Sequence, residues 1–208
     1  SDVRALFAQA AEIKNDRERA QWRAFFLMAV FGGFRIGELL AMRWENVDWR
    51  RARYRVTETW LRPRDGNPAT FGPPKSEASN AWVDLSPECL KSLKAHHEGQ
   101  RAYILGRLRK SRVYTDESLV FASRKGTPLS DRNVIGRVYE PLLRDAGLAI
   151  RRFHDLRHTC ASLLIAQNIS PKYVQQQLRH ASIRITFDTY GHLFDEETQK
   201  AVAGMDDL

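Results

Sequence analysis

The chain has 208 residues, of which 43% are hydrophobic and 28% charged, enough for one large domain with a buried core. Its net charge is +8, and because residues 194–208 carry five acidic residues against Lys200, the remainder has a net charge of +12. That basic charge suits a polyanionic partner, and the alternative is a merely soluble basic protein. No apolar run reaches the roughly 18 residues of a membrane-spanning helix.

Two helices are predicted at the start of the chain, over residues 2–14 and 17–31. The second is apolar on nearly all sides, so we expect it to be buried. Gly32 and Gly33 end it, and a short helix with one apolar stripe follows over about 35–42.

The next segment predicts a small sheet. Residues 45–60 and the returning stretch 82–85 are rich in β-branched and aromatic residues, which is typical of strands. Residues 61–79, between them, are rich in proline and glycine, which indicates a loop. We therefore expect one small antiparallel sheet with a long mobile connection.

The rest of the chain is predicted to be mainly helical. Ser86-Pro87-Glu88 supplies a hydroxyl cap, a proline and an acid, and starts a helix that runs to about Leu108. The acidic tail is a candidate for an additional helix, and the other expected helices cover 130–146, 154–167, 171–179 and 183–193. The fold class is therefore mainly α with a small antiparallel β-sheet (α+β).

Cys89 and Cys160 lie in apolar helical surroundings without metal-ligand spacing. We interpret both as small core residues in a reducing compartment. Residues 1–20 are charged throughout and show no signal peptide, so we expect a cytoplasmic protein.

The helix from His154 carries two histidines and an arginine. At about 100° per residue, one quarter of its circumference holds an apolar stripe of Leu156, Cys160, Leu163 and Leu164. His154, His158 and Ala161 lie nearly opposite, with Arg157 at the border. We therefore expect His154 and Arg157 to be neighbours that point away from the core, with a core histidine satisfied by backbone as the alternative.

A metal site is a second alternative, because His154 and His158 have the i, i+4 spacing of helical ligands. The zinc-protease pattern requires a glutamate after the first histidine, and this chain has Asp155 there. Arg157 would also repel a cationic metal. We therefore expect no metal.

Arg35 follows a nearly all-apolar helix, and a half-buried fixed charge needs a partner. Glu38, one turn further on, is the obvious local partner, so a purely structural pair is one interpretation. The other is an arginine held rigidly enough to bind a phosphate through two parallel hydrogen bonds.

Two further residues are ambiguous by themselves. Lys75 lies in the proline- and glycine-rich loop, where a solvated charge is the ordinary interpretation. We expect Ile183 and Phe187 to pack against the body, with Phe194 as a further candidate, and Tyr190 to lie off that stripe; a lone tyrosine is usually a packing or surface residue.

Together these residues resemble the tyrosine recombinase (phage integrase) family, over the catalytic domain from about residue 5 to 195. Three stretches carry the resemblance: Gly33-Phe34-Arg35-Ile36-Gly37-Glu38-Leu39, His154-Asp155-Leu156-Arg157-His158, and Leu178-Arg179-His180 followed ten residues later by Tyr190-Gly191-His192. Each stretch is weak alone, but their order and separation are specific.

The resemblance implies that Arg35 and Arg157 bind phosphate, that His180 is the second histidine and that Tyr190 is the nucleophile. His154 matches the family's first histidine. The resemblance also assigns the role of catalytic lysine to Lys75 and of a supporting acid to Glu38.

The resemblance further implies a site-specific recombinase or integrase that cleaves and rejoins DNA through a 3′-phosphotyrosyl intermediate, with neither metal nor ATP as cofactor. In this scheme His154 is the better placed base for Tyr190, and Lys75 protonates the departing 5′ oxygen. The alternatives are DNA relaxation of the type IB topoisomerase kind and a non-catalytic DNA-binding module.

The chain departs from the family in two ways. Arg179 replaces the usual glycine before the second histidine, where it would add a DNA contact or alter the turn. The family's separate N-terminal DNA-binding domain is expected to be absent, so that residues 1–208 form a single catalytic domain with an acidic tail over 194–208.

The expected partner is double-stranded DNA, with no membrane. We expect a monomer in free solution and a homotetramer on DNA, assembled by exchange of a C-terminal segment over 194–204. Basic residues near the predicted catalytic elements are candidates for phosphate contacts: Arg43, Arg124, Lys125, Arg132, Lys172 and Arg184. They do not reveal a target sequence.

Overall fold

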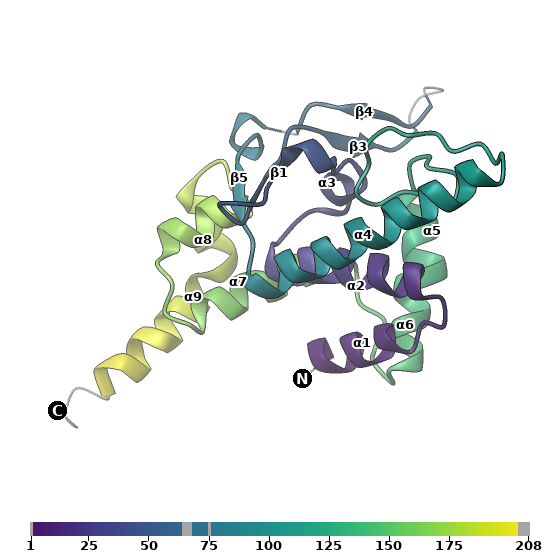
Figure 1. Ribbon diagram of the computed structural model, residues 1–208. Helices are drawn as coiled ribbons and strands as arrows, with labels where there is room; N and C mark the ends of the chain where they lie inside the picture. The colour runs from purple at the N-terminus through teal and green to yellow at the C-terminus, as the bar shows by residue number, and fades with distance from the viewer. Residues whose placement is uncertain (1, 64–67, 75, 204–208) are drawn as a thin grey trace.

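The computed structural model describes residues 2–63, 68–74 and 76–203, with side chains as far as Phe194. Helix α2 (Asp16–Phe31) runs through the helical body and packs against α1 (Asp2–Ala11), α4 (Pro87–Arg109) and α7 (Asp155–Ile165) (Figure 1). The fold is helix-rich with small antiparallel sheets, as the sequence predicted.

Helix α2 is buried as predicted. Its first turn is capped by Asn15, whose side chain accepts a hydrogen bond from the Glu18 backbone N–H. Phe25 and Phe26 are fully buried, and the Phe25 ring meets Phe121 edge-on at 4.9 Å between centroids. This aromatic packing provides a rigid support for the segment that follows the helix, Gly33 to Arg35.

The five short strands of the described residues form two sheets instead of the single predicted one. Strands β1 (Val47–Asp48), β2 (Arg53–Arg55) and β5 (Trp82–Asp84) pair antiparallel in the order β1-β2-β5. Strands β3 (Thr59–Leu61) and β4 (Thr70–Gly72) form a separate hairpin.

Strand β4 lies in the segment that the sequence analysis assigned to a loop. Its three residues are flanked by prolines and glycines that hide the strand pattern, but Phe71 packs on Trp60 across the pair, with the ring centroids 4.8 Å apart. Lys75, from the same segment, lies outside the described residues.

Short helices connect the sheets to the C-terminal half. Two of them, η1 (Trp44–Asn46) and η2 (Glu77–Ser79), are single 3₁₀ turns. The helix predicted over 130–146 is a continuous run that contains a π-helical turn: α5 (Asp131–Val134), η3 (Ile135–Tyr139) and α6 (Glu140–Asp145). Helix α3 (Ile36–Leu40) lies under the β3–β4 hairpin (Figure 1).

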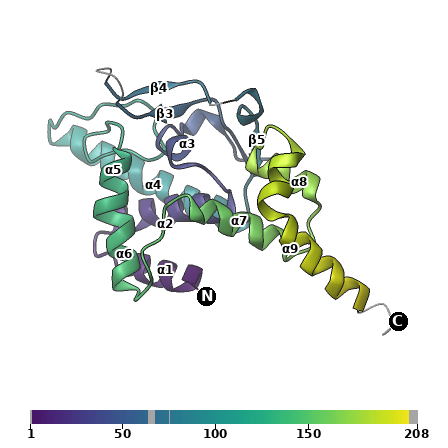
Figure 2. The same cartoon turned by 180° about the vertical axis from the view of Figure 1, so that it is seen from behind.

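The last two helices, α8 (Pro171–Leu178) and α9 (Ile183–Ala203), pack against α7 and against each other. Helix α9 continues ten residues past its predicted end at 193 and projects away from the body in both views (Figures 1 and 2). Within the described residues, no helix is both long and apolar enough to cross a membrane.

The predicted buried face of α9 was wrong. Thr186 and Tyr190 are 0% and 4% exposed, whereas Ile183 and Phe187 are 37% and 47% exposed. The helix presents the tyrosine face to a small apolar cluster on α7 and α8, because the contact that decides the orientation is with residues distant in sequence. Phe194 packs against the edge of that cluster.

The predicted solvent face of α7 was also partly wrong, because both Arg157 and Ala161 are buried. Leu156 belongs to the main core, and Cys160 and Ala161 belong to the cluster beneath α9. The helix therefore lies between two cores, and a single stripe of apolar residues underestimates how much of it is buried. Both cysteines are buried free thiols, as predicted.

Candidate functional site

Arg157 lies in the first turn of α7 and joins two distant segments. Its Nη1 donates to the Gly33 carbonyl at 2.6 Å, and its Nη2 donates to the Leu178 carbonyl at the end of α8. The side chain is almost completely buried. These contacts fix the guanidinium at the junction of the α2–α3 turn and α8.

Arg35 immediately precedes α3, and Glu38 holds it there. One carboxylate oxygen of Glu38 accepts the Arg35 backbone N–H at 2.9 Å, and the other accepts Nη1 at 2.6 Å. Ser79 Oγ, from η2, lies 3.4 Å from the same Nη1. The arginine side chain remains 32% exposed, so the pair with Glu38 orients the guanidinium without burying it.

Arg179 ends α8 in the left-handed region, at φ 56°, where glycine is usually favoured. Its side chain is fully buried, which contradicts the expected DNA contact. Nη2 donates to Glu38 at 2.6 Å and to the Gly33 carbonyl at 3.2 Å, and Nη1 donates to the Gln177 carbonyl at 2.7 Å. The second expectation for this position, an unusual local turn, agrees with its backbone.

The site has an excess of positive charge, with the guanidinium groups of Arg35, Arg157 and Arg179 around the carboxylate of Glu38. Burial opposes ionisation of Glu38, but Arg179, Arg35 and Arg157 outweigh it and lower the pKa of this carboxyl to about 2. Burial, together with the charges of Arg179 and Arg35, lowers the pKa of Arg157 to about 9. An anion bound here would compensate charge that the protein leaves unpaired.

His180 lies directly after Arg179, at the corner between α8 and α9. Its Nδ1 is hydrogen-bonded to Thr186 Oγ1 at 2.9 Å, which orients the ring. Burial, followed by the charges of Arg157 and Arg35, lowers the pKa of His180 to about 4. The ring is therefore neutral near pH 7, and within the described part of the chain Nε2 has no hydrogen-bond partner.

Tyr190 lies on the buried face of α9 and pairs with a histidine of α7. Its hydroxyl is 2.7 Å from Nδ1 of His158, and its ring is parallel to that of His180 with the centroids 6.4 Å apart. Burial raises the pKa of Tyr190, although Arg157 acts in the opposite direction. The phenol is therefore neutral in this arrangement and needs a base before it can act as a nucleophile.

The sequence analysis missed the contact between His158 and Tyr190. It considered His158 only as a metal ligand and favoured His154 as the base. His154 is exposed at the start of α7, with its ring centroid 5.1 Å from that of His158. Partial desolvation of the ring lowers the pKa of His154, and the nearby charge of Arg157 lowers it further. The i, i+4 spacing of His154 and His158 drew attention to His158, but its partner Tyr190 lies 32 residues away in the sequence.

The structure therefore brings together most of the predicted site. Four segments meet where α7 contacts the α2–α3 turn, α8 and α9, and together they supply Arg35, Glu38, Arg157, His180 and Tyr190. His154 lies at the edge of this group, close enough to Arg157 for its charge to be felt.

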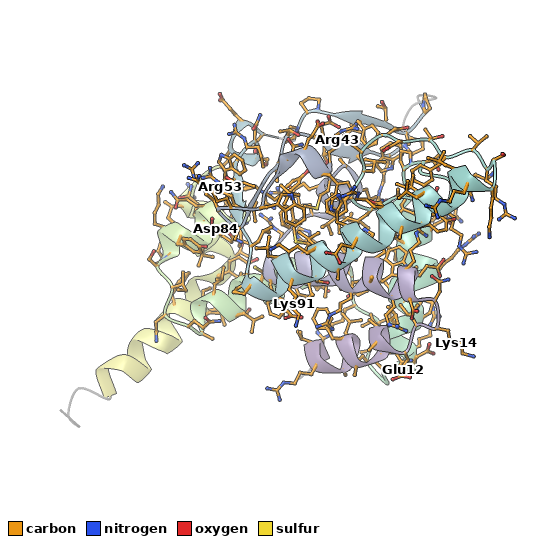
Figure 3. All side chains as sticks on the ribbon, viewed as in Figure 1. Glu12, Lys14, Arg43, Arg53, Asp84 and Lys91 are labelled. Atoms are coloured by element: carbon orange, nitrogen blue, oxygen red, sulfur yellow. The ribbon has the colours of Figure 1, made fainter. Side chains whose placement is uncertain are left out.

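The predicted DNA-contacting residues are spread over the surface and differ in the exposure of their side chains and in the partners that these side chains already have. Arg43, on the sheet side of the molecule (Figure 3), donates to Glu58 and to the Glu117 carbonyl and lies over the Phe71 ring. Its side chain is only 20% exposed, which fits a structural role better than a DNA contact. The other five candidates are exposed: Arg124, Lys125, Arg132, Lys172 and Arg184. Among them, Arg124 pairs with Glu18, and Lys172 donates a hydrogen bond to Gln175.

The surroundings of α8 show how it is fixed to the sheet. Asp84 and Arg53 lie on the paired strands β5 and β2 (Figure 3). Asp84 accepts a hydrogen bond from the Tyr173 hydroxyl at 2.8 Å, and its carbonyl accepts one from the Gln177 amide at 2.9 Å. These bonds hold α8, and with it His180, against the sheet.

Comparison with known proteins gives consistent matches. The model of the phage integrase family matches residues 1–197. A tyrosine recombinase XerC-like protein of Caldanaerobacter subterraneus is 28% identical over 95% of this chain and 52% of its own length. The ICEBs1 integrase of Bacillus subtilis is 30% identical over 92% of this chain and 50% of its own length. The chain thus spans about half the length of these relatives.

Solved structures show the same fold. XerA recombinase superposes with a TM-score of 0.67 at 23% identity, over 97% of this chain and 60% of that protein. The Tn1549 transposon integrase, in complex with transposon right end DNA, gives a TM-score of 0.71 at 16% identity, over 96% of this chain and 63% of that protein.

Proposed function

The chain belongs to the phage integrase family, and from that premise we propose that it is a site-specific DNA recombinase that cleaves and rejoins DNA through a 3′-phosphotyrosyl intermediate, without metal or ATP. The observation that carries this proposal is the cluster of three guanidinium groups around one carboxylate, next to a buried tyrosine. The excess positive charge suits one backbone phosphate, and the tyrosine suits attack on it.

A phosphodiester resists attack because its own negative charge repels nucleophiles. In the proposed mechanism Arg35 and Arg157 bind the non-bridging oxygens, with Glu38 as the supporting acid, and they stabilise the charge that builds up in the transition state. His180 contributes a further donor from Nε2. A bound phosphate would also offset the neighbouring cations, which add to burial in lowering the pKa of His180.

The nucleophile in this mechanism is Tyr190. The Tyr190 oxygen forms a bond to phosphorus, the bond from phosphorus to the 5′ oxygen breaks, and the phenolic proton passes to a histidine. His158 is already hydrogen-bonded to the phenol and can accept this proton, while His154 remains the candidate from the family pattern. The phosphotyrosyl bond resembles in energy the bond that is broken, so rejoining needs no ATP.

A nicked suicide substrate from the flanking genomic region tests the proposal directly. We expect a covalent protein–DNA adduct on denaturing gels, with the DNA 3′ end on Tyr190. Relaxation of unrelated supercoiled plasmid would instead favour the topoisomerase alternative. DNA binding without any adduct would favour the non-catalytic module.

Lys75 is proposed as the acid that protonates the departing 5′ oxygen. Lys75→Ala should slow cleavage of ordinary DNA by roughly 100-fold or more, which is typical for a lost general acid. A substrate with sulfur at the 5′ bridging position has a much better leaving group, so it should be cleaved nearly as fast by the variant as by the parent. Equal losses on the two substrates, measured in single turnovers, would remove Lys75 from this role.

We propose double-stranded DNA as the partner, bound in the bacterial cytoplasm. The Tn1549 integrase of the same fold was solved with DNA, and the basic body of this chain provides phosphate-binding charge. The exposed candidates for these contacts are Arg124, Lys125, Arg132, Lys172 and Arg184. Affinity that depends on such contacts falls steeply with salt.

We further propose that the chain is a monomer in free solution and that four copies assemble on DNA through exchange of the C-terminal segment over 194–204. In support, α9 projects from the body (Figure 2), and its exposed side carries Ile183 and Phe187. The segment itself places apolar residues among acidic ones in the sequence.

Deletion of residues 194–204 should abolish the tetramer on DNA and leave binding to a single site within about two-fold, because the deleted segment carries an acidic net charge that does not favour phosphate contact. Native gels with one and two sites measure both quantities. Unchanged tetramer formation would contradict the exchange.

A further inference from the structure

We propose that Arg179 is a positioning residue, which holds Glu38 and Gly33 so that Arg35 and Arg157 can bind one phosphate together. This inference depends on the proposed function for its phosphate. It concerns a position where members of the family usually have glycine and this chain has a buried cation.

The first observation is the density of contacts around a side chain with no exposed surface. Arg179 donates to the Glu38 carboxylate and to the carbonyls of Gly33 and Gln177, and its guanidinium lies 4.9 Å above the Phe34 ring. Among the described residues, only its Nε lacks a partner within this guanidinium. A buried charge is expensive to desolvate, so its retention calls for an explanation beyond packing.

The second observation is that Arg179 shares its partners with both phosphate-binding arginines. Glu38 uses one oxygen for the Arg35 side chain and gives the other to Arg179. The Gly33 carbonyl accepts hydrogen bonds from both Arg157 and Arg179. Arg179 thus contacts the residue that orients Arg35 and the carbonyl that orients Arg157.

Without Arg179, Glu38 would lose one of the two cations that bind its carboxylate. The carboxylate would have one oxygen without its buried cation. Arg35 already binds the other oxygen, and Arg157 is the further cation whose charge acts on Glu38. Glu38 would then compete with the DNA phosphate for Arg157. In the parent chain Arg179 occupies that oxygen and leaves Arg157 available.

The backbone does not require an arginine. The left-handed conformation of residue 179 suits glycine better than any other residue, so Arg179→Gly relaxes the turn and removes only the side-chain contacts. Arg179→Met keeps most of the side-chain volume without the charge. The two variants separate the effect of the contacts from the effect of a cavity.

The test measures inorganic phosphate binding by the NMR titration of His180, in the parent chain and in both variants. The charged and titratable groups that act on His180 are Arg157, Arg35, Arg179 and His154. We expect both variants to melt as folded proteins and to bind phosphate about 10- to 100-fold more weakly, as for residues that support ligands from behind. The pKa of His180 should rise, because one neighbouring cation is lost.

Cleavage of the suicide substrate should fall over the same range, and Arg179→Lys should restore part of the loss because it returns the charge without the forked donors. Phosphate affinity and a His180 titration equal to the parent's in both folded variants would overturn the inference. If the parent forms no adduct, the proposed function fails, whereas the phosphate titration still decides the role of Arg179.

Discussion

Tyr190→Phe should bind DNA with the affinity of the parent protein and form no covalent adduct. The substitution removes only the phenolic oxygen, and the ring stays in the apolar cluster with Cys160, Val174 and Leu178. The loss of adduct should be complete within detection, because no other group in the site is proposed to attack phosphorus. The measurement is trapping on a nicked substrate, followed by denaturing gels.

Tyr103→Phe is the matched control. Tyr103 is on α4, which supplies none of the proposed catalytic residues, and its hydroxyl donates a hydrogen bond to the Arg124 carbonyl. This variant should form the adduct at a rate close to the parent's. An adduct that persists in Tyr190→Phe would show that another residue is the nucleophile, and mapping of the covalent peptide would identify it.

Arg157→Lys should reduce single-turnover cleavage by about 100- to 1,000-fold, the range for loss of one preorganised donor to a developing charge. A lysine keeps a positive charge, but one ammonium group cannot reproduce the fork that binds the Gly33 and Leu178 carbonyls. These two carbonyls fix the guanidinium of Arg157, so that its remaining N–H groups are oriented for the proposed phosphate. The lysine variant loses that orientation.

Arg144→Lys provides a control for the substitution itself, because Arg144 is 59% exposed and pairs with Glu140 on the same helix. Its cleavage rate should stay within about two-fold of the parent's, since exposed pairs contribute little. Arg157→Lys should also melt at a lower temperature, because two buried carbonyls lose donors. A folded Arg157→Lys protein that cleaves DNA at the parent rate would contradict the proposed role.

Local sequence signals were sufficient for most helices. The cap predicted at Ser86 accepts a backbone N–H, and α4 begins there as expected. Asn15 and Ser170 cap α2 and α8 in the same way. Strand β4 could not be predicted in the same way. It has three residues among glycines and prolines, and its existence depends on pairing with β3.

By itself, the sequence determined the class of the fold and pointed to the residues of the candidate site, because caps, apolar periodicity and motifs can be recognised without knowing which residues contact one another. Only the tertiary structure decided which face of α9 is buried, that Tyr190 pairs with His158, and that Arg179 points inward to Glu38. The physical reason is that hydrogen-bond partners and burial are supplied across the fold: Arg179 and Glu38 are 141 residues apart, and Arg157 and Gly33 are 124 apart.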